Sequence, residues 1–126
     1  PAVLDQVLDS DIVVHSTPVW FWGMPAQLKA YLDRYTQLYT REWEVRDEIK
    51  QRTAGLTFAA LVNCGDTDVA KVASPTVLAF QELAEFSKIW KWAGAATATS
   101  SPSLSEEALK KAFELGKAAV AKALSD

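Results

Sequence analysis

The sequence has few of the residues from which disulfides and metal sites are built. Its 126 residues include one cysteine, Cys64, and one histidine, His15. A single cysteine excludes an internal disulfide, and one Cys with one His cannot form the paired-ligand motifs of zinc sites. We therefore predict neither a disulfide nor a metal site in this chain.

Positive charge and long apolar runs are also scarce. Thirteen Lys and Arg stand against 16 Asp and Glu, a net charge of −3, and no basic run is interleaved with aromatics. Such a chain has no field for a nucleic-acid backbone. The apolar runs are far shorter than the roughly 20 residues of a membrane-spanning helix, and no signal-peptide pattern opens the chain. We expect a cytoplasmic protein with neither nucleic acid nor a membrane span.

Hydrophobic residues make up 49% of the chain, enough for a single domain over residues 1–126. Apolar spacing predicts helices at 2–8, 25–40, 75–88 and 103–124, strands at 12–16, 56–63 and 89–99, and an irregular connection or short helical extension at 41–52. Ser74 and Pro75 suit the start of the third helix, and Ser103 with Glu106 fits a capping box for the last. This alternation indicates parallel strands with right-handed crossovers, the α/β class.

An aromatic segment separates the first strand from the helix that follows it. Pro18 and Pro25 bound the segment, which carries the run Trp20-Phe21-Trp22 and then Gly23. Ligands of open α/β sheets bind at the carboxyl ends of strands. The aromatic run could therefore hold a flat cofactor ring, or it could pack against a neighbouring subunit.

The same segment carries a family resemblance. The apolar run Asp11-Ile12-Val13-Val14, then Thr17-Pro18-Val19-Trp20, then Gln27-Leu28-Lys29 and Asp33-Arg34 resemble the third strand, flavin loop and third helix of flavodoxin-like NAD(P)H-dependent FMN reductases and their iron-sulfur flavoprotein and quinone-reductase relatives. Trp20 replaces the usual tyrosine. The resemblance implies a three-layer sandwich with a parallel sheet, here truncated to about three strands with flanking helices.

The resemblance also implies a cofactor, FMN, with NAD(P)H as co-substrate and a quinone or other small electron acceptor. Two loops would hold the ring, with no catalytic side chain and no metal. The implied cofactor residues are Thr17, Pro18, Val19, Trp20, Trp22 and Gly23 in the first loop, and Asn63, Cys64, Gly65 and Asp66 in the second. Lys29 and Asp33 would have a structural role.

The chain departs from the family at its beginning. The family's first strand, phosphate loop, first helix and second strand have no counterpart before residue 1, and neither has the cysteine cluster of the iron-sulfur relatives. With the family's strand order 2-1-3-4-5, this leaves one edge of the strand at 12–16 unpaired. We expect FMN binding that is weak or lost, because the phosphate cradle is missing.

Two other functions remain open. The chain could be a non-catalytic assembly module, or a flavodoxin-type electron carrier that does not react with NAD(P)H. A homo-oligomer is expected, through the exposed strand edge or through the helix face of Tyr31, Tyr35, Tyr39 and Trp43, for which packing is the favoured role. His15 is interpreted as a satisfied structural histidine and Cys64 as an inert thiol.

Overall fold

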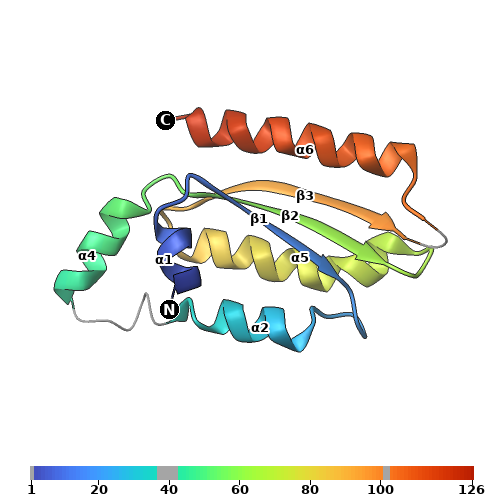
Figure 1. Cartoon of the computed structure of the whole chain (residues 1–126), viewed down its shortest axis with the longest axis horizontal. Coiled ribbons are helices and arrows are strands. Elements are labelled where there is room, and N and C mark those ends of the chain that lie inside the picture. Colours follow the sequence, from blue (N-terminus) through green and yellow to red (C-terminus); the bar gives the residue numbers. More distant parts are fainter. Residues whose placement is uncertain (1, 37–42, 101–102) are drawn as a thin grey trace.

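Three parallel strands alternate with helices in the computed structural model (Figure 1), which describes residues 2–36, 43–100 and 103–126. In chain order the elements are α1 (Ala2–Leu8), β1 (Ile12–Pro18), α2 (Ala26–Asp33), α4 (Trp43–Arg52), β2 (Thr57–Cys64), α5 (Val69–Phe86), β3 (Lys91–Thr99) and α6 (Glu106–Leu124). The predicted α/β alternation is confirmed. Residues 43–52, for which two possibilities were open, are helical.

The sheet has the order β1-β2-β3, and both pairings are parallel. Its register places Val14 beside Ala59 in one pair and Phe58 beside Trp92 in the other. The β2–β3 ladder shifts between Phe58 and Ala59, opposite Gly94, whose φ of +118° suits only glycine. Gly94 therefore marks a bulge in a true third strand.

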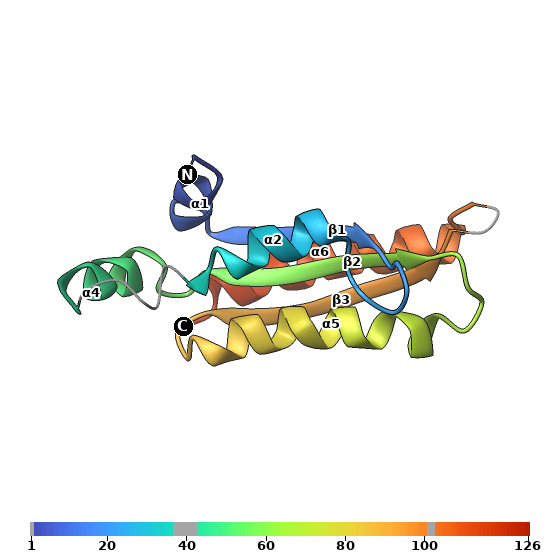
Figure 2. The same cartoon turned by 90° about the horizontal axis from the view of Figure 1, so that it is seen from below.

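Helices cover the two faces of the sheet unequally. Figure 1 shows α6 alone on one face, with α2 and α5 on the other, and Figure 2 shows α2 and α5 side by side from below. β1 is an edge strand of the described sheet, and its Val14, on the α6 face, is half exposed. The unpaired edge expected from the sequence is present in the described chain. No described helix is long and apolar enough to cross a membrane.

The larger core lies at the amino ends of the strands, on the α5 side. We call it the amino-end cluster, and its buried members are Leu4, Val7, Leu8, Tyr35, Ile49, Leu56, Phe58, Ala84 and Trp90. Tyr31 packs against it and shares a hydrogen bond of 2.5 Å with the Tyr35 hydroxyl. The packing role predicted for these two tyrosines is confirmed. Tyr39 and the side chain of Trp43 lie outside the described part.

Two helix boundaries differ from the prediction on the α5 side. α2 ends at Asp33, where the N–H of the Arg34 cap donates to the last carbonyls. α5 begins at Val69 behind Asp68, whose carboxylate accepts from the Lys71 N–H at 3.3 Å, so Pro75 lies inside the helix. Proline leaves a carbonyl one turn earlier without its donor. The Ser74 hydroxyl donates to that Lys71 carbonyl at 3.2 Å and compensates for the loss.

The capping box predicted for the last helix is also wrong. Ser105, not Ser103, is the N-cap of α6, and its hydroxyl accepts from the Ala108 N–H at 3.1 Å. α6 consequently starts at Glu106, with Glu106 and Glu107 in its first turn. Both serines precede the same apolar pattern, so spacing alone did not distinguish them.

Candidate functional site

The loops that follow the three strands meet at the carboxyl edge of the sheet. The Val19 N–H donates to the Asn63 carbonyl at 2.8 Å and ties the first loop to the end of β2. The Ser100 N–H donates to the Cys64 carbonyl at 2.9 Å and ties β2 to the segment after β3. The structure therefore brings the two predicted groups of site residues to one edge.

Residues 19–24, the aromatic loop, are held in a tight turn. Trp20 and Gly23 exchange two backbone hydrogen bonds, of 2.8 and 3.1 Å. Between them Phe21 and Trp22 have φ of 50° and 61°, the left-handed region that side chains with a Cβ rarely adopt. Two consecutive positive φ values define a type I′ turn, which normally uses Asn and Gly. Backbone strain of this kind concentrates at functional sites.

The turn presents three aromatic rings to solvent. Trp20 is 60%, Phe21 96% and Trp22 56% exposed. Exposed aromatic side chains gathered at the carboxyl edge of a parallel sheet offer a large flat surface for a planar ring. Phe21 belongs to the aromatic run predicted as a possible ring platform but not to the cofactor residues implied by the family resemblance, although it is the most exposed of the three. Its neighbours Trp20 and Trp22 already place it in an aromatic run in the sequence.

The other predicted residues of the first loop lie deeper. Thr17 is buried, and its hydroxyl donates to the Pro18 carbonyl at 2.9 Å. Pro18 is exposed, whereas Val19 packs on a smaller core of Ala60, Val62, Ala73 and Phe80. The side chains that can reach a ligand from this loop are therefore the aromatic ones.

The second predicted loop is mainly backbone. Cys64 ends β2 with a buried side chain, and its thiol lies 3.5 Å from the Asp66 carbonyl. Gly65 is exposed, and a Cβ there would meet nothing within 4 Å. The Asp66 carboxylate accepts from the Asp68 N–H at 2.8 Å. Gly65 thus leaves open space through which a ligand can approach the backbone, and Cys64 offers no accessible thiol.

The helix N-termini at this edge are poorly suited to a phosphate. Anions bind at helix N-termini through free N–H groups. The first turn of α5 is already capped by the Asp68 carboxylate, and α6 opens with Glu106 and Glu107. Carboxylates at those positions repel a second anion. Within residues 2–36, 43–100 and 103–126, neither of these two helix N-termini offers a cradle for a phosphate.

His15 lies below this edge, inside the sheet–helix interface. Its ring stacks on Phe80 at 4.7 Å and on Phe58 at 5.6 Å between centroids, and Tyr31 lies at 5.9 Å. Neither ring nitrogen has a hydrogen-bond partner among the described residues. Burial lowers the pKa of His15 from 6.5 to about 4, so the ring is neutral at pH 7. The histidine is structural, as predicted, but it is not satisfied.

Lys29 and Asp33 form an ion pair one turn apart on α2. Both side chains are more than half exposed. The pair is on the helix surface and agrees with the structural role predicted for it.

The fold and this edge define a class: a three-layer α/β protein with an open parallel sheet and an aromatic loop at the carboxyl ends of its strands. The chain belongs to the family described as having a flavodoxin-like fold, whose sequence profile matches residues 2–111. The predicted resemblance is confirmed at that level. A search of curated protein sequences gives no match.

Two solved structures share the fold. The Trp repressor binding protein from Bacillus subtilis is 21% identical, with a TM-score of 0.66 over 99% of this chain and 76% of the other. The flavodoxin, WrbA-like protein from Agrobacterium tumefaciens is 16% identical, with a TM-score of 0.70 over 94% of this chain and 70% of the other. The TM-scores establish a common fold. Because the identities are low, the two structures carry no information about the chemistry of this chain.

Proposed function

We propose that this chain supplies the ring-binding loops of an NAD(P)H-dependent FMN oxidoreductase, which passes electrons to a quinone or another small acceptor. The observation that carries the proposal is the strained aromatic loop at the carboxyl edge of a flavodoxin-like sheet. Strain at Phe21 and Trp22 destabilises the free protein, and contacts to a ligand can offset that cost.

The proposed roles follow from accessibility. Trp20 and Trp22 would hold the isoalloxazine ring, and Thr17, Pro18 and Val19 fix the start of their loop beside Asn63. The open backbone at Gly65 would contribute to the same site, with Cys64 and Asp66 shaping that turn. When bound, FMN supplies the hydride-accepting centre, so the protein needs no nucleophile or general acid.

Anaerobic reduction tests the proposal. The purified chain is mixed with FMN and NADPH without oxygen, and the visible absorbance of the oxidised flavin is followed against a protein-free control. We expect the absorbance to fall faster with protein, and Trp20→Ala to remove most of that acceleration. Phe113→Ala is the matched control, since Phe113 is an equally exposed aromatic on α6.

An unchanged absorbance, despite measurable FMN binding, would contradict NAD(P)H reactivity and favour an electron carrier. Equal rates for Trp20→Ala and the parent chain would contradict the assignment of the aromatic loop.

A second candidate is an assembly module, favoured by the apolar side chains that α6 and the β1 edge leave exposed. Besides Val14 on the β1 edge, four apolar side chains of α6 are at least half exposed: Leu109, Phe113, Val120 and Leu124. Apolar surface of this extent often marks an interface. Size-exclusion chromatography with light scattering tests this candidate, because a stable monomer at all concentrations would contradict it.

A further inference from the structure

The outer edge of β3 is open to pairing with a further strand. β3 lies at one edge of the described sheet, with β2 on its other side. The Ser100 N–H donates to β2, and the backbone groups of a strand point alternately to its two sides. The N–H groups of Ala95 and Thr97 therefore point away from β2. An edge of this kind is a template for another strand.

Residues 93–99 of β3 lack the side chains that usually protect an edge strand. Natural edge strands commonly carry charged residues or proline. Residues 93–99 are all Ala, Gly or Thr, whereas the β1 edge ends in Pro18, which has no N–H to donate. The bulge of the β2–β3 ladder falls before Gly94, so Ala95 and Thr97 lie in the regular part of the strand. A second strand can therefore approach β3 closely.

A hollow of about 600 Å³ lies beside this edge, between β3 and α6. Its floor is formed by residues 93–97 of β3. Its wall is formed by side chains of α6: Glu107, Lys110, Lys111, Glu114, Leu115 and Ala118. Leu115 Cδ1 is 3.6 Å from the position that a Cβ would take at Gly94. The middle of α6 therefore lies over the middle of β3.

The α6 flank that borders the hollow carries charges of alternating sign. Glu107, Lys111 and Glu114 follow one another at helical spacing on this flank. Lys111 pairs with Glu107 at 2.9 Å and Glu114 pairs with Lys117 at 2.8 Å, and all four side chains are more than half exposed. A copy of this flank running in the opposite direction places Lys111 beside Glu114 and Glu114 beside Lys111. The flank is therefore complementary to itself.

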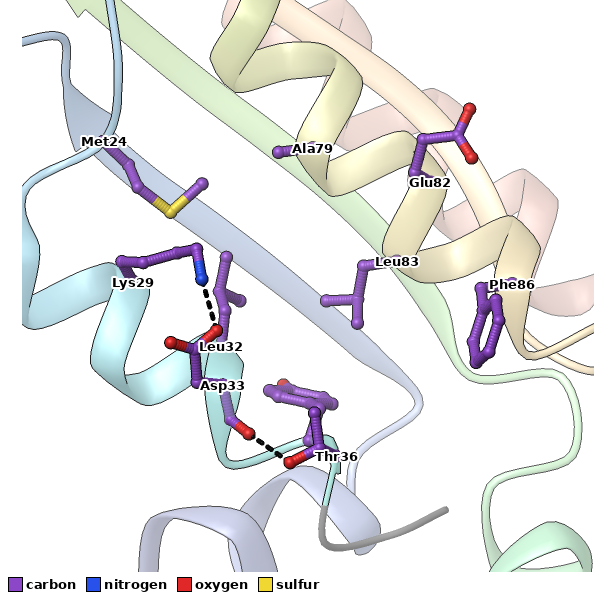
Figure 3. A pocket seen from close by; sticks show the side chains of 10 residues that line it. Met24, Lys29, Leu32, Asp33, Thr36, Ala79, Glu82, Leu83 and Phe86 are labelled. Carbon is purple, nitrogen blue, oxygen red and sulfur yellow. Dashed lines mark hydrogen bonds and ion pairs between the residues drawn. The ribbon is translucent and has the colours of Figure 1, made fainter. Parts of the chain in front are cut away.

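On the other face of the sheet, α5 also leaves the β3 edge free. Figure 3 shows Ala79 and Leu83 of α5 turned towards α2, away from that edge. On the β3 side of the helix, Val77 packs against the same small core as Ala95. The next residue, Leu78, is 54% exposed. A second copy paired at Ala95 would bring the two exposed Leu78 side chains towards each other.

We propose that β3 pairs with the β3 of a second copy of this chain, antiparallel about a two-fold axis near Ala95. The three strands of each copy then form one continuous sheet. The two α6 helices run antiparallel on the same face, because a two-fold axis perpendicular to a sheet does not exchange its faces. Lys111 of each copy faces Glu114 of the other across the two hollows, which merge at the interface.

The charged flank of α6 favours a second copy over an unrelated extended peptide. Such a peptide pairs with the amides of Ala95 and Thr97 but brings no charged helix to Lys111 and Glu114, whereas a second copy does both. The exposed apolar residues of the second candidate function, Phe113 among them, lie on the other flank of α6. No residue of the proposed flavin site takes part, so the inference rests on neither proposed function.

The test uses the full chain without flavin, over micromolar to millimolar concentrations. Light scattering after size-exclusion chromatography should give a mass that rises towards that of two chains. Amide hydrogen exchange, followed by NMR, should slow at Ala95 and Thr97 as the protein concentration increases, because these amides become paired. The Val14 amide on the β1 edge is the internal control, since Asp11 and Val19 bond to β2 and Val14 therefore points outward. Its exchange should not change.

Charge reversal locates the contact. Lys111→Glu places a second carboxylate opposite Glu114 of the other copy, and the dissociation constant of the dimer should rise about tenfold or more. Adding Glu114→Lys to this variant restores opposite charges and should restore most of the affinity. Lys50→Glu makes the same charge change at an exposed position of α4 and should have no effect. Phe113→Ser, on the other flank of α6, should also leave the dimer intact. All these side chains are exposed, so the variants are expected to fold.

A mass of one chain at every concentration would overturn the proposal. A dimer in which exchange slows at Val14 but not at Ala95 and Thr97 would assign the interface to the β1 edge and would also overturn it. Equal weakening by Lys111→Glu and Lys50→Glu, or failure of the double reversal to recover affinity, would overturn the pairing of Lys111 with Glu114.

Discussion

The two ends of the sheet differ in how completely their polar groups are paired. At the amino end, the buried Thr53 hydroxyl donates to the Ile49 carbonyl at 2.8 Å and accepts from the Trp90 indole N–H at 2.9 Å. Towards the carboxyl end, buried His15 and Thr76 have no partner among the described residues. The amino end also encloses its aromatic rings, whereas the carboxyl edge exposes Trp20, Phe21 and Trp22.

This difference indicates that the amino end of the sheet stabilises the fold, whereas the carboxyl edge is suited to ligand binding. Complete pairing and close ring contacts, such as Phe58 against Trp90 at 5.1 Å, stabilise the amino end. Positive φ values and unpaired buried groups lower stability at the carboxyl edge, where a ligand can offset the loss. Changes at the amino end should therefore reduce the free energy of unfolding, and changes at the carboxyl edge should reduce ligand binding.

The largest stability effect is expected at Trp90. Trp90→Ala removes a buried ring from the amino-end cluster and the indole N–H that donates to the Thr53 hydroxyl. The free energy of unfolding, measured in urea, should therefore fall by about 3–5 kcal/mol. Trp20→Ala, at an exposed indole, should change the free energy of unfolding by less than about 0.5 kcal/mol. Similar losses for the two variants would contradict the division between the ends.

Acid should weaken the protein through His15. Its pKa is about 4 when folded and near 6.5 when unfolded, so between these values the unfolded chain binds the extra proton. The rings around it, those of Tyr31, Phe58 and Phe80, carry no charge in this range. The contribution of neutral His15 to the free energy of unfolding is complete above pH 6.5. It decreases as the pH falls towards 4, by about 3 kcal/mol in total.

Urea unfolding at several pH values measures this loss, with His15→Phe as the control. The variant should keep its stability between pH 6.5 and 5, where the parent chain loses it. Parallel curves for the two proteins would show that another group is responsible.

Two matched threonine variants compare the ends directly. Both threonines are fully buried, but only Thr53 has hydrogen-bond partners in the structure. Thr53→Val should lower the free energy of unfolding by about 1–2 kcal/mol, and Thr76→Val should leave it unchanged or raise it by up to about 1 kcal/mol. Thermal and urea unfolding of both variants provide the measurement, and a loss at Thr76 equal to that at Thr53 is the contrary result.

The smallest effect concerns the strained turn. Trp22→Gly relieves a left-handed residue but adds chain entropy to the unfolded state, so we expect a net gain of about 0.5–1 kcal/mol. Flavin binding should weaken, because the indole is gone. Gly55→Ala is the converse control: at its φ of +84° it should lose about 1 kcal/mol. Lower stability of Trp22→Gly would show that the turn stores no strain.

Periodicity predicted the order of elements because strands and helices here bury continuous apolar faces. It missed the start of α5 because Ser74-Pro75 has the features of an N-terminus, whereas in the structure the Ser74 hydroxyl donates to the Lys71 carbonyl that Pro75 leaves without a donor. It likewise chose Ser103 over Ser105, because both precede the same apolar stripe.

The sequence predicted ligand-binding loops at the ends of β1 and β2, and the structure brings these two loops together at one edge of the sheet. The turn at Phe21 and Trp22 could not be predicted, because aromatic residues rarely adopt positive φ. His15 was interpreted as satisfied because buried polar groups usually are, and pairing depends on neighbours from other elements. Thr76 occupies a core position of the α5 stripe between Ala73 and Phe80, a polar exception that was visible in the sequence.

The most direct test is a titration of the ¹⁵N-labelled chain with lumiflavin, the flavin ring without a phosphate, and separately with FMN. At about 1 mM ligand, an interaction of only about −4 kcal/mol is half saturated. We predict amide shifts at Val19, Trp20 and Gly65 with both ligands at similar affinity, and none at the Trp90 indole. Absence of shifts at the carboxyl edge with either ligand, or shifts centred on Trp90, would contradict the account.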